Sequence, residues 1–168
     1  VGDHGHDEVI AIADQVPGTI VVSNVIEAKA LKKYKRAGVV SQSTQTIENV
    51  QEIINVLMTK VFDLHFVNTI CYPTKRNQEQ IKELAKIADL MIIIGSFTSA
   101  NSKRLTLLSK DINKCTYQVT CAKELNRKWF KNVNIVGISA GASTPDYLIK
   151  EVKESIEKNG GINEEKHI

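Results

Sequence analysis

The chain has 168 residues, 42% of them hydrophobic, which is enough to bury a real core in one domain or in two small lobes. Its net charge is +3, but Lys and Arg are mixed with Glu along helical segments and aromatic residues make up only 5%, so we expect no nucleic-acid partner. The longest apolar run, Leu90 to Ile94, is too short to cross a bilayer, so we expect no membrane association.

The cysteines and the first residues bear on where the protein works. Cys71, Cys115 and Cys121 lack CxxC spacing, which indicates neither a disulfide framework nor a self-contained zinc site and favours a reducing compartment. The chain starts at Val1 and Gly2 without an initiator Met, and this dipeptide resembles the end of a strand. We therefore expect a truncated chain.

A strand, a hydroxyl-rich loop and an amphipathic helix recur in that order along the chain, which predicts parallel α/β sheets with right-handed crossovers. The units change in size near residues 62–68, so we predict two small α/β lobes, 1–67 and 68–168. Strands are predicted at 1–2, 18–22, 38–40, 64–67, 90–94, 114–119 and 133–136, and helices are predicted to begin near residues 9, 25, 47, 75–78, 99–101 and 144–145.

The stretch from Asp89 to Leu108 shows this pattern most clearly. The apolar run Leu90 to Ile94 ends at Gly95, and hydroxyl and amide side chains then lead into an amphipathic helix. The start of a helix has unpaired N–H groups and a positive dipole end, so this loop suits a phosphate or another anion. Taken alone, Ser99 or Asn101 is better explained as a helix cap.

In a parallel sheet, every loop that follows a strand lies at the same edge, and ligands bind there. One capped helix is routine, but several Ser-, Thr- and Asn-rich loops at one edge favour a polar, anionic ligand. The side chains expected at this edge are His4, His6, Glu8, Ser41, Ser43, Thr44, Asn68, Thr69, Cys71, Thr74, Ser96, Thr98, Ser99, Asn101, Ser139 and Ser143.

Three of these loop residues are of types that carry out chemistry. Cys71 lies near a predicted helix start with Lys75 beside it, which favours a reactive thiolate, although an inert half-buried thiol fits equally well. Glu8 is a candidate proton donor and His6 a candidate phosphate donor, and for each a solvated loop position is the alternative.

Other residues with reactive side chains have simpler interpretations. Cys115 and Cys121 are interpreted as structural, His4 is a weaker candidate, and His65 is interpreted as a core or edge histidine. The run Gly137 to Gly141 matches G-x-S-x-G, the nucleophile turn of α/β hydrolases. Its helix is predicted to begin too late for such a turn, and Asp146 and His167 are the only downstream partners, so we do not favour a hydrolase.

With these residues together, the chain resembles the 4-hydroxy-3-methylbut-2-enyl diphosphate reductase family, the last enzyme of the methylerythritol phosphate route to isoprenoids. The matching segments cover almost the whole chain, in the right order and spacing. They are Gly5 to Val9, Gln42 to Thr44, Thr69 to Cys71 with Asn77 and Gln78, Gly95 to Leu105, and Gly137 to Pro145.

The resemblance implies a three-lobed trefoil around a [4Fe-4S] iron-sulfur cluster, of which this chain would hold the second and third lobes. Cys71 matches one cluster ligand, and the other cysteines belong to the missing first lobe. Glu8 matches the proton-delivering carboxylate, and Ser43 matches a threonine near the substrate hydroxyl. The residues that match the substrate-binding group, most of which grip the diphosphate, are His6, Thr44, Ser99, Asn101 and Ser143. We expect these groups to open into a single cavity between the two lobes.

The implied reaction removes an allylic hydroxyl with two electrons and two protons and gives isopentenyl and dimethylallyl diphosphates. A ferredoxin or flavodoxin would supply the electrons, in a bacterial cytoplasm or a plastid stroma. With a single cluster cysteine this chain alone is predicted to be inactive, so the alternative is a non-catalytic diphosphate-binding module. Ala100 replaces a family serine, and Asp7 replaces a proline, which is expected to loosen its loop.

Overall fold

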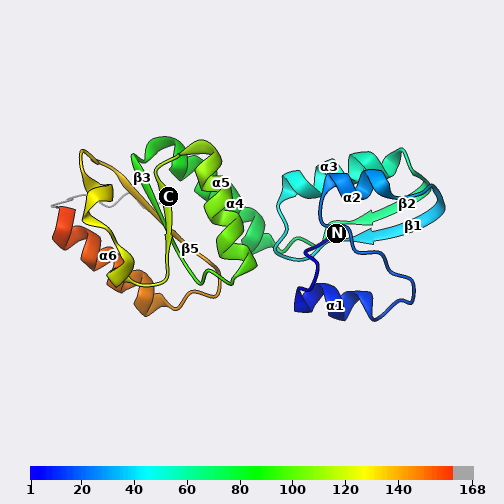
Figure 1. The fold of residues 1–168 in the computed structure, drawn as a ribbon, viewed down its shortest axis with the longest axis horizontal. Helices are drawn as coiled ribbons and strands as arrows, with labels where there is room; N and C mark the ends of the chain where they lie inside the picture. The colour runs from blue at the N-terminus through cyan, green and yellow to red at the C-terminus, as the bar shows by residue number, and fades with distance from the viewer. Residues whose placement is uncertain (161–168) are drawn as a thin grey trace. The chain divides into compact units, whose positions relative to one another are not determined.

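The structure is a computed structural model that describes residues 1–160, with side chains up to residue 158. It divides into two compact units, Val1–Lys75 and a second unit that begins at Arg76. Each unit has its own parallel β-sheet flanked by helices, which confirms the α/β class and the two small sheets (Figure 1). The lobe limits expected from the sequence, 1–67 and 68–168, stay a prediction. No helix in the described range has the length and apolar character of a membrane span.

The first unit is built on two parallel strands, β1 (Tyr34–Val40) and β2 (Val61–Val67), paired from Tyr34 with Val61 to Val40 with Val67. The crossover between them is helix α3 (Ile47–Met58). This helix and α2 (Val25–Ala30) cover one face of the sheet, and α1 (Asp7–Ala13) lies on the other face (Figure 1). The core of the unit consists of Val22, Ala28, Ile53 and Leu57.

The predicted strand at 18–22 is wrong, because this segment has no regular secondary structure. A β-strand needs a hydrogen-bonded partner along its length. The backbone bond that joins this segment to residues 1–2 runs from the Gly2 N–H to the Val22 carbonyl (3.0 Å). Val1 and Gly2 lie beside the end of this segment, and this bond does not make the segment a strand.

The second unit has a three-stranded parallel sheet in the order β4 (Thr116–Val119), β3 (Leu90–Ile94), β5 (Val136–Ala140). All five side chains of β3 are fully buried, as expected for a central strand covered on both faces. Alternate side chains of β3 enter different core clusters, one with Ile81 and Leu105 and the other with Val152 and Ile156. The helices are α4 (Tyr72–Ile87), α5 (Ala100–Ile112) and α6 (Asp146–Gly160), with short 3-10 turns η1 (Ala122–Glu124) and η2 (Arg127–Phe130).

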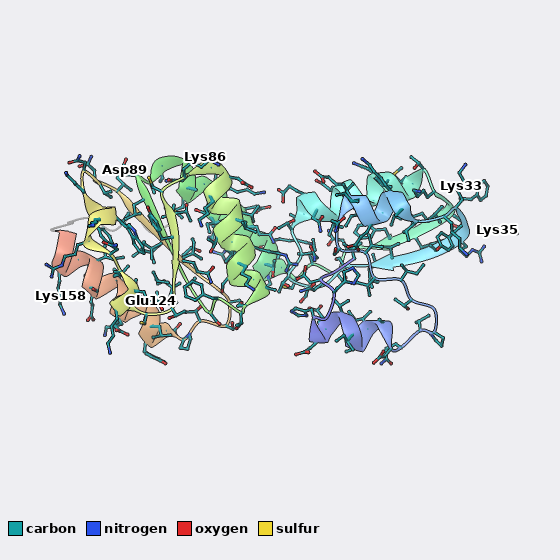
Figure 2. The ribbon with its side chains drawn as sticks, viewed as in Figure 1. Lys33, Lys35, Lys86, Asp89, Glu124 and Lys158 are labelled. Carbon is teal, nitrogen blue, oxygen red and sulfur yellow. The ribbon has the colours of Figure 1, made fainter. Side chains whose placement is uncertain are left out.

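Asp89 fixes the point at which β3 and β5 begin. It lies just before β3, beside the end of α4 that carries Lys86 (Figure 2). Its carboxylate accepts the N–H groups of Asn134 and Ile135, each at 2.9 Å, and these two bonds lower the pKa of Asp89 below its ordinary value. The acidic residue therefore aligns the segment that leads into β5.

The last strand lies further along the chain than predicted. Residues 133–136 were expected to form it, with a loop from Gly137, but β5 runs from Val136 to Ala140. At Gly137 an added Cβ would lie 2.3 Å from Met91 Sδ and 2.9 Å from Leu84 Cγ. Gly137 is thus a packing residue inside the strand, where helix α4 approaches the sheet closely, and not the first residue of a loop.

We predict that Gly137→Ala destabilises the second unit by about 1–3 kcal/mol, because the added methyl group overpacks the contact with Met91 and Leu84. Urea denaturation followed by the fluorescence of Trp129, which stacks on Tyr117 in this unit, measures the effect. Gly38→Ala is the matched control, because a Cβ at Gly38 meets nothing within 4 Å. Equal stabilities of Gly137→Ala and wild type would contradict the prediction.

Candidate functional site

The carboxylate of Glu8 is held at two points by a single residue of the first unit. The Ser43 N–H donates to Glu8 Oε1 at 2.7 Å, and the Ser43 Oγ–H donates to Oε2 at 2.8 Å. Glu8 lies in the first turn of α1, and Ser43 lies in the loop between β1 and α3. The two predicted catalytic residues, 35 positions apart, are therefore in direct contact. A carboxylate oxygen accepts more than one hydrogen bond, so each oxygen keeps room for a further donor.

The same serine connects this pair to Cys71. The Cys71 N–H donates to the Ser43 carbonyl at 3.0 Å, and Cys71 directly precedes helix α4. Its half-buried Sγ lies 2.8 Å from Thr74 Oγ1. Helix α4 begins at Tyr72, earlier than predicted, so the thiol lies at the N-terminal, positive end of the helix dipole. Glu8, Ser43 and Cys71 thus form one cluster, and the structure brings all three together.

His6 is the N-cap of α1, and this contact fixes its tautomer. The Glu8 N–H donates to His6 Nδ1 at 3.2 Å. In a neutral imidazole one nitrogen accepts and the other donates, so Nε2 carries the hydrogen and is a donor. Asp7 follows as the first residue of the helix. The expectation that Asp7 loosens this loop is wrong, because a carboxylate in the first turn suits the helix dipole.

Hydrogen bonds of Gln42, Asp3 and Thr69 hold the loop that follows β1. Gln42 Nε2 donates to Thr44 Oγ1 at 2.9 Å, and the Asp3 N–H donates to Gln42 Oε1 at 2.9 Å. The Ser41 N–H donates to Thr69 Oγ1 at 2.8 Å, and the Thr69 hydroxyl donates to the Ser41 carbonyl. Thr69 therefore ties the segment before Cys71 to the loop that carries Ser43.

In the second unit, the predicted anion loop ends in a capped helix. Ser99 is the N-cap of α5, and its Oγ accepts the Ser102 N–H at 3.3 Å, which confirms both the strand and the helix start predicted here. Asn101 Oδ1 and Ser102 Oγ are buried and have no hydrogen-bond partner among the described residues. Buried polar atoms are normally paired, so this helix start has unused capacity for a polar ligand.

Glycine lets two loops of the second unit meet at Ser102. An added Cβ at Gly95 or at Gly141 would lie 2.3 or 2.4 Å from Ser102 Oγ. The Gly141 N–H and the Thr144 hydroxyl both donate to the Ile94 carbonyl, at 2.9 and 3.0 Å. The loop that carries exposed Ser143 is thereby fixed beside the loop that carries Ser99.

Gln118 is a supporting residue that the sequence argument missed. Its Nε2 donates to the carbonyls of Gly95 and Ser96, at 3.1 and 3.0 Å, from within strand β4. Thr106 Oγ1 donates to its Oε1 at 3.1 Å. A lone glutamine in a short strand has no motif around it, so no sequence signal identifies this role.

The hydrolase alternative is not supported by this geometry. Ser139 lies inside β5, not on a turn between the strand and α6, and α6 begins only at Asp146. The other predicted partner, His167, lies outside the described residues. A nucleophile elbow needs the serine at a sharp strand-to-helix turn, which this segment does not form.

The three thiols do not form a complete metal site by themselves. Within the described part of the chain, no three His, Cys, Asp or Glu side chains are grouped so that they could hold a metal ion. Cys115 and Cys121 flank β4, so a strand of that length separates them by roughly 15 to 20 Å. Cys121 follows the carboxyl end of β4. Among the contacts of the described residues, the bond to Ser43 places Cys71 with the candidate site residues.

Comparison with known proteins decides the family. The family model described as LytB protein matches residues 1–157. The chain belongs to the LytB family. A relative from Geotalea uraniireducens (strain Rf4), named 4-hydroxy-3-methylbut-2-enyl diphosphate reductase, is 43% identical over 99% of this chain and 58% of its own length. A protein of the same name from Aquifex aeolicus (strain VF5) is 40% identical over 94% of this chain and 56% of its own.

Two solved structures of diphosphate reductases are similar to this chain in fold. The structure of the E-1-hydroxy-2-methyl-but-2-enyl-4-diphosphate reductase from Plasmodium falciparum is 27% identical, with a TM-score of 0.86 over 93% of this chain and 51% of that one. A structure of (E)-4-hydroxy-3-methyl-but-2-enyl diphosphate reductase is 44% identical, with a TM-score of 0.54 over 74% of this chain and 44% of that one. The LytB chain described here thus spans little more than half the length of the curated relatives it matches.

A second carboxylate, Glu27, gives the region around His4 a pH dependence. Hydrogen bonds from the Ser23 hydroxyl (2.7 Å) and the Ser23 N–H (2.8 Å), with a smaller contribution from His4, lower the pKa of Glu27 from 4.5 to about 2. A lowered pKa stabilises the folded state above the unfolded value of 4.5. That contribution is lost as the pH falls through about 2.

We predict that Ser23→Ala raises the pKa of Glu27 towards its ordinary value, because the largest cause of the shift is removed. An NMR titration of the Glu27 side-chain carboxyl between pH 1.5 and 6 measures it. His4→Ala is the control and should raise the pKa less, since the bond from the Ser23 hydroxyl contributes more than the bond from His4. A larger rise in His4→Ala than in Ser23→Ala would show that this ranking is wrong.

Proposed function

We propose that the LytB protein containing this chain is a 4-hydroxy-3-methylbut-2-enyl diphosphate reductase, and that the chain contributes its proton donor, one cluster ligand and much of its diphosphate grip. The observation that carries this proposal is the two-point contact of Ser43 with Glu8, joined through the Ser43 carbonyl to the Cys71 N–H. The names of the relatives and the order of the matching motifs support it.

Glu8 has the contacts of a positioned general acid. Two bonds from Ser43 fix the plane of its carboxyl group, and each oxygen keeps a lone pair that can receive or release a proton. With Glu8 protonated, the direction of this bond reverses: the Glu8 O–H donates to Ser43 Oγ, and the Ser43 hydroxyl is then able to donate to a substrate hydroxyl. One proton would pass in this way from Glu8 through Ser43 to that oxygen, which leaves as water once two electrons from the electron donor and a second proton complete the reduction.

The diphosphate end of the substrate is anionic, so neutral hydrogen-bond donors and the N-terminal ends of helices suit it. Ser99, Asn101 and exposed Ser143 provide these in the second unit, where α5 also offers its first unpaired N–H groups. A rotation of the Asn101 amide exchanges its buried Oδ1 for the Nδ2 donor, which suits a phosphate oxygen. In the first unit, His6 Nε2–H and the Thr44 hydroxyl are the proposed donors.

The iron-sulfur cluster that the family implies fits this chain at one position. Cys71 is suited to supply a single thiolate ligand. Among the described residues, no three His, Cys, Asp or Glu side chains lie close enough together to supply the other ligands. We therefore assign Cys71 one ligand role and no other cysteine of the chain any. An electron donor of the ferredoxin or flavodoxin type, in a bacterial cytoplasm or plastid stroma, completes the proposal.

The test of the proposal uses the complete LytB protein, reconstituted without oxygen with iron and sulfide. We predict a brown wild-type protein and loss of most visible absorption in Cys71→Ala, because a cluster ligand is missing. Cys115→Ala is the control and should keep its absorption, since Cys115 is exposed outside the candidate site. A colourless wild-type protein that binds inorganic pyrophosphate would instead favour the non-catalytic module.

We also predict that Glu8→Gln in the complete protein lowers turnover at least about 100-fold, the lower range for loss of a general acid. Glutamine keeps the size, its oxygen can accept from the Ser43 N–H, and its NH2 can donate to Ser43 Oγ with the direction of that bond reversed, so substrate binding should remain within about threefold. Turnover is measured by the release of the two diphosphate products and binding by calorimetry. Glu52→Gln, an exposed carboxylate on α3, is the control. Full turnover in Glu8→Gln would show that Glu8 is not the general acid.

A further inference from the structure

Thr74 is a buried threonine in the first turn of α4 to which the proposed function gives no role. It is 4% exposed, and its Oγ1 lies 2.8 Å from Cys71 Sγ, three residues earlier in the chain. Both residues belong to the first unit, and the thiol is half-buried. A buried hydroxyl is therefore in contact with the sulfur to which the proposed function assigns a cluster-ligand role.

The start of α4 explains why a hydroxyl occupies this place. Cys71 directly precedes the helix, and its carbonyl accepts the Lys75 N–H (3.1 Å), as the carbonyl of an N-cap residue does. An N-cap side chain normally accepts from the N–H of the second or third helical residue. The second residue here is Pro73, whose nitrogen carries no hydrogen. The hydroxyl of Thr74, the third residue, thus lies where a backbone N–H usually serves the N-cap side chain.

Ligation of iron by Cys71 would fix the direction of this hydrogen bond. In the free thiol either atom can be the donor, because the S–H and the O–H both carry a hydrogen. The form that binds a metal is the thiolate, whose sulfur has no hydrogen and can only accept. With Cys71 as a ligand, the Thr74 hydroxyl must therefore donate to Sγ, and the bond is charge-assisted.

A donor at a ligating sulfur affects how easily an iron-sulfur cluster accepts an electron. Hydrogen bonds to the sulfurs are among the factors that set the reduction potential of such clusters. Reduction adds negative charge that the sulfur ligands share, so a hydrogen bond to sulfur stabilises the reduced state more than the oxidised one. Burial of Thr74 increases this effect, because little water competes for the bond and the local dielectric is low.

We propose that Thr74 is a positioning residue that acts through Cys71. Its hydroxyl donates to the Cys71 thiolate and thereby raises the reduction potential of the cluster. This role rests on the proposed function, because it requires Cys71 to be a cluster ligand. Threonine suits the role, since its branched Cβ restricts χ1 in a helix and burial holds the side chain against the sulfur.

The test measures the reduction potential of the complete LytB protein, reconstituted without oxygen, in a redox titration followed by EPR. Thr74→Val has nearly the shape of threonine but lacks the hydroxyl. We expect its equilibrium constant for one-electron reduction to fall about threefold to tenfold, which is a fall of about 28 to 59 mV at 59 mV per tenfold change. Thr74→Ser retains a hydroxyl and should keep the wild-type potential.

A matched control removes a buried hydroxyl elsewhere in the chain. Thr116, in β4, is 1% exposed, and its hydroxyl contacts Ser109 Oγ (2.9 Å) and the Asn113 carbonyl (2.6 Å). Thr116→Val should therefore keep the wild-type potential. Iron content and visible absorption check that each variant holds its cluster. Thr74→Ala, with the same expected fall, replaces Thr74→Val if that variant does not hold it.

Four outcomes would overturn this role of Thr74. Equal potentials in brown wild type and brown Thr74→Val would remove it and leave the proposed function standing. A fall in Thr74→Ser as large as that in Thr74→Val would show that packing, and not the hydroxyl, sets the potential. A raised KM in Thr74→Val at an unchanged potential would show that the hydroxyl contacts the substrate instead. A colourless wild-type protein would remove the proposed function, and this role with it.

Discussion

The contact of Ser43 with two distant segments is the constraint on which the candidate site depends. Its N–H and hydroxyl hold Glu8, and its carbonyl accepts the Cys71 N–H, so the proposed proton donor and a thiol are fixed against one residue. The backbone makes two of these three bonds, which explains how serine can stand at a position where the resemblance implies threonine. The side chain needs only its hydroxyl, and both residues provide one.

In the second unit, close packing and not charge shapes the anion loops. Strand β3 is fully buried, and Gly95 and Gly141 let the two loops beyond the sheet approach Ser102 within distances that no Cβ would allow. Ser99 can then cap α5, while the buried Asn101 oxygen has no partner among the described residues. The proposed anion site thus offers neutral donors and a helix dipole, so its affinity would not require a nearby lysine.

The elements with a strong local signal were predictable from the sequence. The run Leu90 to Ile94 and the cap at Ser99 depend on local apolar patterning and capping, and both were confirmed. The segment 18–22 was not predictable, because whether an apolar run becomes a strand depends on a partner elsewhere in the chain. Gly137 was misplaced for a similar reason, since a glycine at a loop start and one packed under a helix look alike in sequence.

The candidate site residues likewise divide into those that were predictable from the sequence and those that were not. Glu8, Ser43 and Cys71 were predicted through their motifs, whereas Gln118 supports the anion loop through long-range bonds that no motif encodes. The substitution of Asp7 for proline is instructive, because Asp7 is the first residue of a helix capped by His6. That position favours proline, which needs no N–H there, and also favours a carboxylate, which suits the dipole. Two unlike side chains therefore keep the same helix start, and with it the position from which Glu8 reaches Ser43.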